Sequence, residues 1–553
     1  MATYEIDAST TTAVTALEAG DAFIVDAGVT VSTGGASIVA TGGAANRSFD
    51  IHGTLQSTGG PAIDFGTAGT ASSGNRITIG DEGRIGSGGD GIRIASTGLS
   101  LVNEGEIGAR LVGVTASATT RITNSGAISA GGTAGISASG DSSVVTNNGT
   151  VTAFGNALVL TGAAIIATNN GLAEASKGAA ILSRGDRAIV TNNGTAKAAA
   201  LAVSVTGEGA TVTNNGLIQS LNDRGLSVTG DTAIITNNGT ISAKRAGITV
   251  TGDDTIVTND GGIDTKAVAI VVSADGVILR NNQTISAGSA MSVTGDGASL
   301  ANYGTLAGTL ASRATVDLAK ATAAALQNNG LIEAVKTAVL GGAGSQSVVN
   351  TGTIRGHIDL GAGNDYLENT GAITGTVRGG KGDDVYVLNG NAVTIVELRG
   401  GGNDVVKSSA SHVLADNIEQ LFLFGARKID GTGNASANRI EGNNAANRLD
   451  GGAGNDVLVG HRGNDTLTGG KGVDTFVFAT GHGRDTITDF RAKGALHDVL
   501  DLTGLASITD FNDLKADHLT VKGADILING LNGDSILLQN VALKDLDAGD
   551  FWF

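Results

Sequence analysis

The chain has 553 residues, of which 87 are glycine, one is proline, none is cysteine and 3% are aromatic, although 41% are apolar. This composition excludes a conventional globular core, a disulfide scaffold and a disordered polymer, and it favours a narrow core of stacked strands and tight turns. The net charge of −18 and the lack of a basic patch argue against nucleic acid as a partner. An acidic excess suits a protein that meets divalent cations.

Residues 1–50 alternate apolar and polar side chains, as in Phe23–Val31, but lack the register of the repeats that follow. We expect this segment to be an N-terminal cap, because an open solenoid end would expose unpaired strand edges. Its first residues have neither the basic nor the apolar region of a secretory signal peptide. No apolar run reaches the roughly 18 residues of a transmembrane helix, so no membrane insertion is expected.

Residues 51–375 are organised by a repeat of about 22 residues. Each repeat contains an asparagine, and apolar residues alternate near it, as in Ile248-Thr249-Val250, which is the pattern of a short strand. Strands this short bury their apolar side only when successive coils stack and pair in parallel. The sequence therefore predicts an all-β chain in which this segment is a parallel β-helix, with the asparagines forming a ladder along its axis. The recurring asparagines are Asn103, Asn124, Asn147, Asn169, Asn192, Asn214, Asn237, Asn259, Asn281, Asn302, Asn328, Asn350 and Asn369.

An acidic column recurs a few residues before the asparagines. Its carboxylates could lie on solvent-facing turns and cap local backbone amides. They could also bind cations weakly, because like charges stacked about 5 Å apart are unfavourable unless they are solvated or bridged. The sequence leaves both interpretations open, and neither is catalytic. The column comprises Asp141, Asp186 and Glu208, and then the candidates for a weak cation column, Asp231, Asp253, Asp275 and Asp296.

Enzymatic activity on the β-helix is the main alternative to a structural role. None of the seven histidines is followed by glutamate, which excludes the H-E-x-x-H metalloprotease motif. A polysaccharide lyase or epimerase would gather polar side chains from several coils on one face. The candidates for such a site are scattered in register, and the aromatic residues that would support a sugar are scarce. They are Arg184, Asp186, Arg187, Asp223, Arg224, Lys244 and Arg245.

The uninterrupted Asn-Asn-Gly rungs, such as Asn147-Asn148-Gly149, resemble the passenger β-helices of bacterial surface adhesins and haemagglutinin-like proteins. This resemblance spans residues 80–375. It implies a structural protein and not an enzyme.

A nine-residue repeat begins at Gly433 and continues without a gap. The first six residues of each unit are glycine-rich, so the backbone can turn sharply and direct carbonyl oxygens inward. The sixth is aspartate in the last three units, and the eighth is apolar. Calcium takes six to eight oxygen ligands, which stacked turns from both sides of a roll can supply. The units are Gly433–Glu441, Gly442–Asp450, Gly451–Val459, Gly460–Thr468 and Gly469–Val477.

These units resemble the RTX (hemolysin-type) calcium-binding repeat, G-G-x-G-x-D-x-U-x. The resemblance implies a calcium β-roll over residues 376–480, which follows the β-helix. Asn438 and Asn447 replace aspartate in the first two units, which implies weak or empty sites there. Isolated copies of the motif upstream add Asp365, Asp384 and Asp404 as candidate ligands. In the repeats themselves, the resemblance implies calcium ligation by Asp456, Asp465 and Asp474 and by the turns that contain Gly452, Gly454, Gly463, Gly470 and Gly472.

Residues 481–553 are similar to the segment that closes the roll in RTX proteins. The resemblance implies that Asp485 and Asp489 complete the last calcium site. The end, Ser535–Phe553, resembles the uncleaved C-terminal signal for type I secretion. Secretion to the medium or the cell surface through that machinery is therefore expected, with folding delayed until the chain meets extracellular calcium.

Together these features predict a secreted, calcium-binding structural protein of the surface-layer, filament or adhesin type. The expected partners are calcium, the type I secretion machinery, and either further copies of the chain or a cell-surface polysaccharide. A polysaccharide lyase or epimerase carried by the β-helix remains the alternative function.

Overall fold

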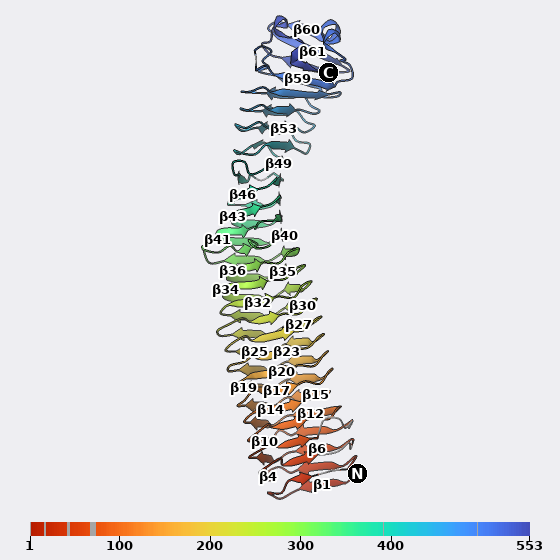
Figure 1. Ribbon diagram of the computed structural model, residues 1–553, viewed down its shortest axis with the longest axis vertical. Coiled ribbons are helices and arrows are strands. Elements are labelled where there is room, and N and C mark those ends of the chain that lie inside the picture. Colours follow the sequence, from red (N-terminus) through yellow and green to blue (C-terminus); the bar gives the residue numbers. More distant parts are fainter. Residues whose placement is uncertain (1, 16–17, 41–44, 67–72, 391, 495) are drawn as a thin grey trace. The chain divides into compact units, whose positions relative to one another are not determined.

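The computed structural model describes residues 2–15, 18–40, 45–66, 73–390, 392–494 and 496–553. Almost every element in these ranges is a β-strand, and the chain divides into two compact units, Met1–Val316 and Asp317–Phe553. Each unit is a stack of coils built from short strands, and Figure 1 follows them along the sequence by colour. No helix within the described ranges is long and apolar enough to cross a membrane.

The coils of unit 1 contribute strands to three columns, and strands within each column pair in parallel. The first column contains β1 (Thr3–Ile6), β3 (Ala22–Val25), β6 (Ser48–Ile51), β9 (Arg76–Ile79), β12 (Leu99–Asn103), β15 (Thr120–Asn124), β18 (Val144–Asn147), β21 (Ile166–Asn169), β24 (Ile189–Asn192), β27 (Thr211–Asn214), β30 (Ile234–Asn237), β33 (Ile256–Asn259), β35 (Ile278–Asn281) and β37 (Ala298–Asn302).

The second and third columns complete each coil of unit 1. The second contains β4 (Thr30–Thr33), β7 (Thr54–Ser57), β10 (Arg84–Ser87), β13 (Glu106–Ala109), β16 (Ala127–Ala130), β19 (Thr150–Ala153), β22 (Leu172–Ala175), β25 (Thr195–Ala198), β28 (Leu217–Ser220), β31 (Thr240–Ala243) and β38 (Thr305–Gly308). The third contains β2 (Val14–Thr15), β5 (Ile38–Ala40), β8 (Ile63–Phe65), β11 (Ile92–Ile94), β14 (Val112–Ala116), β17 (Ala134–Ala138), β20 (Asn156–Leu160), β23 (Ile181–Arg184), β26 (Val203–Thr206), β29 (Leu226–Val228) and β32 (Ala246–Val250). The long strands β34 (Gly262–Val272) and β36 (Thr284–Val293) run through both columns.

The alternation of side chains along each strand produces the core. In β21, Ala167 and Asn169 are buried, whereas Ile166 is exposed. Asn169 donates from Nδ2 to Oδ1 of Asn192 at 2.7 Å and to the carbonyl of Gly171 at 3.2 Å. The amide therefore bonds both to the next coil and to the turn of its own coil. Consecutive asparagines make the same bond from Asn103 to Asn302 in unit 1, over 2.6–2.9 Å. The predicted asparagine ladder is thus confirmed.

The segment 1–50 contributes strands of its own to the stack. Strand β1 pairs in parallel with β3, β3 with β6, and β6 with β9. Residues 1, 16–17 and 41–44 of the predicted cap lie outside the described residues. The division of the chain into cap, β-helix, roll and C-terminal segment stays a prediction.

Unit 2 is also a stack of parallel coils. One side contains β40 (Ala323–Asn328), β42 (Ser345–Asn350), β44 (Tyr366–Asn369), β47 (Val385–Leu388), β49 (Val405–Ser408), β51 (Gln420–Leu423), β53 (Arg439–Glu441), β55 (Val457–Val459), β57 (Thr475–Ala479), β59 (Val499–Gly504) and β63 (Phe551–Trp552). We call this series the long column. Between its strands, the first coils carry β41 (Leu331–Leu340), β43 (Thr353–Ala362), β45 (Ala372–Ile373), β46 (Thr376–Lys381) and β48 (Thr394–Val396).

The later coils carry the opposite column, which contains β50 (His412–Val413), β52 (Gly431–Thr432), β54 (Arg448–Asp450), β56 (Thr466–Thr468), β58 (Arg484–Ile487) and β62 (Asp534–Leu538). Strand β61 (Asp525–Leu531) pairs antiparallel with β62, and β60 (Leu519–Lys522) pairs antiparallel with β61. Short helical segments lie at Phe511–Asp513 (α1), Leu514–His518, Leu543–Asp545 and Ala548–Asp550.

The coils of unit 2 vary in length, and those that carry the nonapeptides are shorter than those at its start. The step between ladder asparagines is 22 residues from Asn328 to Asn350 and 19 from Asn350 to Asn369. In the repeats, the N–H of Asn438 donates to the side chain of Asp456, which lies 18 residues later, the length of two nonapeptides. Consecutive nonapeptides therefore alternate between the long column and the opposite column. These observations confirm an all-β chain with a parallel β-solenoid of about 22 residues per coil and a roll in its C-terminal region.

Candidate metal centre

A row of acidic and amide residues stands immediately before the strands of the long column. In six of its residues the backbone N–H donates to the side chain of the row member one coil later. Asp365 donates to Oδ1 of Asp384 at 2.8 Å, and Asp384 donates to Oδ1 of Asp404 at 2.9 Å. Farther along, Asp456 donates to Oδ1 of Asp474 at 2.9 Å. We call this row the buried ladder, and it comprises Asp365, Asp384, Asp404, Glu419, Asn438, Asp456, Asp474 and Asp498.

A shorter row has the same geometry before strands of the opposite column. The N–H of Asn447 donates to Oδ1 of Asp465 at 2.7 Å, and that of Asp465 donates to Oδ1 of Asp485 at 2.7 Å. The three aspartates that the sequence assigns to the repeats are therefore divided between two faces: Asp456 and Asp474 lie on one, and Asp465 lies on the other.

The second carboxylate oxygen is the feature that points to a metal. In six aspartates Oδ2 is buried and has no hydrogen-bond partner among the described residues. A buried carboxylate oxygen without a partner is costly, and such groups in proteins are usually paired or coordinate a metal. A hard divalent cation with oxygen ligands fits this donor set. The six are Asp365, Asp384, Asp404, Asp456, Asp465 and Asp474.

Burial also raises the pKa values of these groups. The pKa of Asp365 is raised to about 8, that of Asp384 to about 6, and that of Asp404 to about 7. Burial likewise raises the pKa of Asp456 and of Asp465 to about 7. Neighbouring carboxylates add to the effect, whereas the backbone hydrogen bond to each group acts in the opposite direction. A cation placed among these groups would remove the electrostatic cost of ionising them.

The first glycine of each of the last three repeat units lies close to an unpartnered oxygen. A Cβ at Gly451, Gly460 or Gly469 would lie 2.5 Å from Oδ2 of the aspartate five residues later, which is closer than real Cβ contacts allow. The turn glycines implied as ligands have positive φ angles between +93° and +149°, which side-chain-bearing residues rarely adopt. Ligation through their carbonyl groups stays a prediction. They are Gly452, Gly454, Gly463, Gly470 and Gly472.

Two amides replace carboxylates at the start of the repeats. Oδ1 of Asn438 accepts the N–H of Asn434 at 2.7 Å, and its Nδ2 donates to the carbonyl of Ile418 at 2.8 Å. Asn447 accepts the N–H of Asn443 at 2.9 Å and donates to the carbonyl of Ile429 at 2.5 Å. These side chains are satisfied without a metal, which agrees with the weaker sites expected there.

The acids after the repeats are engaged differently from those within them. Both oxygens of Asp485 have partners, because Oδ2 bonds with Nδ1 of His482 at 2.6 Å. Asp489 is exposed and accepts the N–H groups of Gly469 and Gly470 at 2.9 and 2.8 Å. Asp489 thus holds the last glycine turn in place. Whether Asp485 and Asp489 also bind calcium stays a prediction.

The weak cation column predicted in unit 1 consists of exposed side chains. Oδ1 of Asp231 accepts the N–H of Asp253 at 3.0 Å, and Oδ1 of Asp253 accepts the N–H of Asp275 at 2.8 Å. Oδ1 of Asp275 in turn accepts the N–H of Asp296 at 2.7 Å. We call these four residues the exposed ladder. Their contacts fit a cap on backbone amides, and cation binding by this column stays a prediction.

Three residues of the site have no signal in the nonapeptide pattern. Glu397 is buried near Asp384 and Asp404, Glu419 occupies one rung of the buried ladder, and His482 binds Asp485. All three lie outside the sixth position of a repeat unit, so only the register of the folded coils identifies them. Asp498 belongs to the closing segment and ends the ladder, where its Oδ1 accepts the N–H of Asp474 at 3.0 Å.

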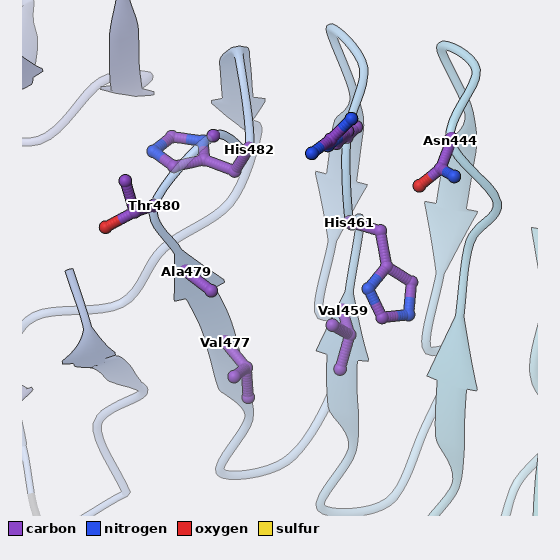
Figure 2. Close-up of a pocket in the computed structure, with 9 residues that line it drawn as sticks. Asn444, Val459, His461, Val477, Ala479, Thr480 and His482 are labelled. Carbon is purple, nitrogen blue, oxygen red and sulfur yellow. The ribbon is translucent and has the colours of Figure 1, made fainter. Parts of the chain in front are cut away.

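A pocket of about 300 Å³ opens on the roll. Figure 2 shows His482 and Thr480 on one segment and His461 on the neighbouring one. Nε2 of His461 lies 3.1 Å from Oε2 of Glu441, and the Thr480 hydroxyl donates to the carbonyl of Gly504 at 3.2 Å. The pocket therefore brings together no hydroxyl nucleophile with a histidine base among the residues that line it.

Three of the polar candidates for an enzyme site, Asp223, Arg224 and Arg245, make surface ion pairs. Asp223 lies 3.8 Å from Nε of Arg224 and 3.9 Å from a guanidinium nitrogen of Arg245. The side chains of Asp223, Arg224 and Arg245 are 31%, 40% and 75% exposed. Pairs this open to solvent contribute little to stability.

The fold and the site together define a parallel β-solenoid with a two-sided, carboxylate-lined roll that suits hard divalent cations. Residues 432–467, 441–476 and 451–487 match the RTX calcium-binding nonapeptide repeat (4 copies). The chain thus carries RTX repeats, which bind calcium, and the resemblance noted in the sequence is confirmed. An adhesin-like β-helix upstream is consistent with the solenoid of unit 1. No curated protein matches the chain in sequence.

Proposed function

We propose that the chain is a secreted structural protein of the cell surface or extracellular matrix, whose roll folds on calcium and whose β-solenoid assembles with further copies. RTX repeats are typical of type I secreted proteins, and a calcium-binding structural role fits both the repeats and the solenoid. The observation that carries the proposal is the row of buried aspartates with unpartnered Oδ2 atoms.

Calcium then acts as the signal for folding outside the cell. In a calcium-poor cytosol the buried ladder would be a column of mutually repelling carboxylates, and unit 2 would stay open and competent for export. Outside the cell, calcium binds only the folded coils and therefore stabilises them by mass action. Export by the type I machinery, with a signal in the segment 481–553, belongs to this proposal.

Self-association is supported by an exposed row of isoleucines on the first column of unit 1. Ile166, Ile189, Ile234, Ile256 and Ile278 are 39–51% exposed. They lie in register on neighbouring strands, except that Thr211 takes the place of isoleucine on the strand between Ile189 and Ile234. We call these five residues the isoleucine face.

A second copy of the chain is the occupant that matches this face. Parallel strands repeat every 4.8 Å or so, and only a surface with the same period meets every rung. The chain's own face has that period, and stacked identical side chains pack well against each other. Beside it runs an exposed amide ladder in which Asn170 donates to Asn148 and Asn193 donates to Asn170, each at 2.7 Å, so the backbone carrying the face is held in a regular array.

Electron microscopy and light scattering of the purified chain, with calcium and then with chelator, test the proposal. We expect ordered assemblies with calcium that dissociate in chelator. Ile189→Ser combined with Ile234→Ser and Ile256→Ser should abolish assembly while calcium binding persists. Leu111→Ser with Leu221→Ser, which removes side chains 51% and 50% exposed on other parts of the coils, is the matched control and should assemble normally. Monomers in every condition would overturn self-association.

The same preparation addresses the enzymatic alternative. Incubation with alginate or pectin, followed by absorbance of unsaturated products, should give no signal above buffer. A calcium-dependent product would instead support a lyase.

A further inference from the structure

A cavity of about 430 Å³ opens at the corner between the second and third columns of unit 1. It lies where β31 leads into β32 and where β34 passes from one column to the other. Its charged lining consists of Asp223, Arg224 and Arg245, and its apolar lining includes Val268 and Val271. A cavity with an apolar wall and a few convergent polar groups has the composition of a ligand site.

The backbone at this corner is held by hydrogen bonds between successive coils. The N–H of Arg245 donates to the carbonyl of Asp223 at 3.2 Å. The hydroxyl of Thr265 donates to the carbonyl of Arg245 at 2.6 Å and accepts the N–H of Ala267 at 3.0 Å. The turn that carries Arg245 is therefore bonded to the coils on both sides of it.

The two arginines of the cavity share a single carboxylate. Nε of Arg224 lies 3.8 Å from Oδ1 of Asp223, and a guanidinium nitrogen of Arg245 lies 3.9 Å from the same oxygen. Among the described residues, no other acid forms an ion pair with either guanidinium. Each guanidinium has five N–H donors, so most of them are available to a second anion.

The corner is basic, although the chain as a whole is acidic. Residues 222–224, 244–246 and 264–268 contain four basic and two acidic side chains, whereas the net charge of the chain is −18. Lys244 and Lys266 are exposed and directly follow Ala243 and Thr265, which are paired on neighbouring strands. A local excess of positive charge attracts anions that the rest of the chain would repel.

Thr249 contributes a buried hydroxyl to the same cavity. Alternation along β32 places Ile248 and Val250 in the core and Thr249 on the outer side of the strand. Val159 and Leu182, at the corresponding positions of earlier coils, are partly exposed, whereas Thr249 is only 7% exposed. Its Oγ1 has no hydrogen-bond partner among the described residues. A buried hydroxyl without a partner is costly, and a ligand oxygen bonded to it would remove that cost.

We propose that this cavity binds the carboxylate of an acidic sugar, such as a uronic acid unit of an extracellular polysaccharide. Arg224 and Arg245 hold the carboxylate, because a planar guanidinium can bond to it through two N–H groups. The hydroxyl of Thr249 bonds to a sugar hydroxyl, and the apolar wall packs against the C–H groups of the ring. The choice of an extracellular sugar rests on the proposed function, whereas recognition of a carboxylate rests on the cavity alone.

The apolar wall distinguishes this ligand from other anions. Phosphate or sulfate would bond to the arginines but would leave Val268 and Val271 in contact with water. Nucleic acid is held by many phosphate contacts along its backbone, whereas this basic corner is confined to three coils. A carboxylated sugar matches both the charged and the apolar parts of the cavity.

Isothermal titration calorimetry of the full-length chain with a galacturonic acid oligomer tests the site. We expect one oligomer to bind per chain, and a glucose oligomer of the same length, which has no carboxylate, should not bind. Binding should be equal with calcium and with chelator, because the cavity lies in unit 1. Inorganic phosphate should displace the oligomer only weakly.

Substitutions at the corner should change the affinity in opposite directions. Arg224→Gln combined with Arg245→Gln should weaken binding at least tenfold. Asp223→Asn removes the competing carboxylate and should strengthen binding, which mere damage to the corner would not do. Arg355→Gln is the matched control, because Arg355 also forms an exposed ion pair, with Glu333 at 3.3 Å, and should bind the oligomer normally.

The isoleucine-face variant separates this proposal from the proposed function. Ile189→Ser with Ile234→Ser and Ile256→Ser should lose assembly and keep the binding of the oligomer. Thr249→Val preserves the shape of the side chain and should weaken binding severalfold. Unchanged affinity in the double arginine variant, or equal binding of the neutral oligomer, would overturn the site.

Discussion

The exposed ladder of unit 1 and the buried ladder of unit 2 are built on the same type of hydrogen bond but differ in the environment of their carboxylates. In both, one carboxylate oxygen accepts the backbone N–H of an acid in an adjacent coil, as Asp231 does from Asp253 and Asp404 does from Asp384. In unit 1 the side chains face solvent, which hydrates the remaining oxygen. In unit 2 glycine turns enclose that oxygen, and no hydrogen-bond partner among the described residues reaches it.

The difference shows that a periodic acidic column is not by itself a metal site. Stacking and backbone capping are common to both ladders, so neither distinguishes them. Burial of the second oxygen does, because a buried carboxylate needs a proton or a cation, whereas an exposed one is stabilised by water. The shortening of the coil from 22 to 18 residues accompanies this change.

Removal of calcium should produce the largest effect and should separate the two regions. We expect chelator to abolish the cooperative unfolding transition of unit 2, because its carboxylates then repel one another in a low-dielectric environment. The transition of unit 1 should remain, since its core is apolar and its asparagine ladder is satisfied. Differential scanning calorimetry with and without calcium measures both. A single transition that shifts as a whole would contradict this division.

Neutralising the acids sharpens the comparison. Asp456→Asn with Asp465→Asn and Asp474→Asn should weaken calcium binding by at least about tenfold per site, or about 1.4 kcal/mol each. The matched change in the exposed ladder, Asp231→Asn with Asp253→Asn and Asp275→Asn, should leave calcium binding unchanged.

Isothermal titration calorimetry compares the two variants. Equal losses of affinity in both would mean that exposed carboxylates also bind calcium, and would support the weak cation column.

Low pH should partly substitute for calcium in stabilising unit 2. The pKa of Asp365 is raised to about 8, and those of Asp404 and Asp456 to about 7, by burial. Because the folded pKa exceeds the unfolded value of about 4, protonation favours the folded form. Without calcium, this contribution is fully present below about pH 4 and is lost as the pH rises through 6 to 8. With calcium the dependence reverses, because protons compete with the ion.

Urea unfolding of unit 2 at pH 5 and pH 8, each with and without calcium, measures this effect. The calcium-free protein should be more stable at pH 5, and the stabilisation by calcium should be larger at pH 8. A calcium-free protein that gains stability toward pH 8 would contradict the burial of these acids.

The smallest predicted effect is the difference in stability between losing a buried and losing an exposed asparagine of unit 1. Asn192→Ala removes a buried amide that donates to Asn214 at 2.8 Å and to the carbonyl of Leu217 at 3.1 Å. We expect a loss of about 1–3 kcal/mol in the stability of unit 1, because buried partners lose their bonds. The adjacent Asn193→Ala removes an exposed amide and should cost less than about 0.5 kcal/mol. Thermal unfolding should show a larger loss of stability in Asn192→Ala than in Asn193→Ala. Equal losses would contradict the idea that the buried amides stabilise unit 1 more than the exposed ones.

Much of the fold follows from the sequence because the repeat fixes the register. The recurring asparagine predicts the ladder, and a strand with alternating apolar residues beside it predicts stacked parallel coils. The sixth-position aspartates of the repeats are likewise visible in the sequence. Their division between two faces follows only from the length of the folded coil, which contains two nonapeptides.

The rest of the site depends on coils that break the period. Glu419 enters the ladder 15 residues after Asp404, and Glu397 approaches from the end of β48. The 15-residue step is not a multiple of the nine-residue repeat, and Glu397 does not occupy the sixth position of a repeat unit, so the spacing of the repeats selects neither residue. The burial of the remaining oxygen is also not visible in the sequence, because it depends on which residues of the folded coil cover Asp231 and Asp404.

Hydrogen exchange measured by mass spectrometry, with calcium and with chelator, tests the central claim most directly. The backbone N–H groups of Asp384 and Asp456 and those of Asp253 and Asp275 make the same kind of bond in the two ladders. We predict that chelator removes protection from peptides containing Asp384 and Asp456, by at least a hundredfold in rate, and leaves peptides containing Asp253 and Asp275 unchanged. Equal protection of the buried ladder with and without calcium would contradict the account.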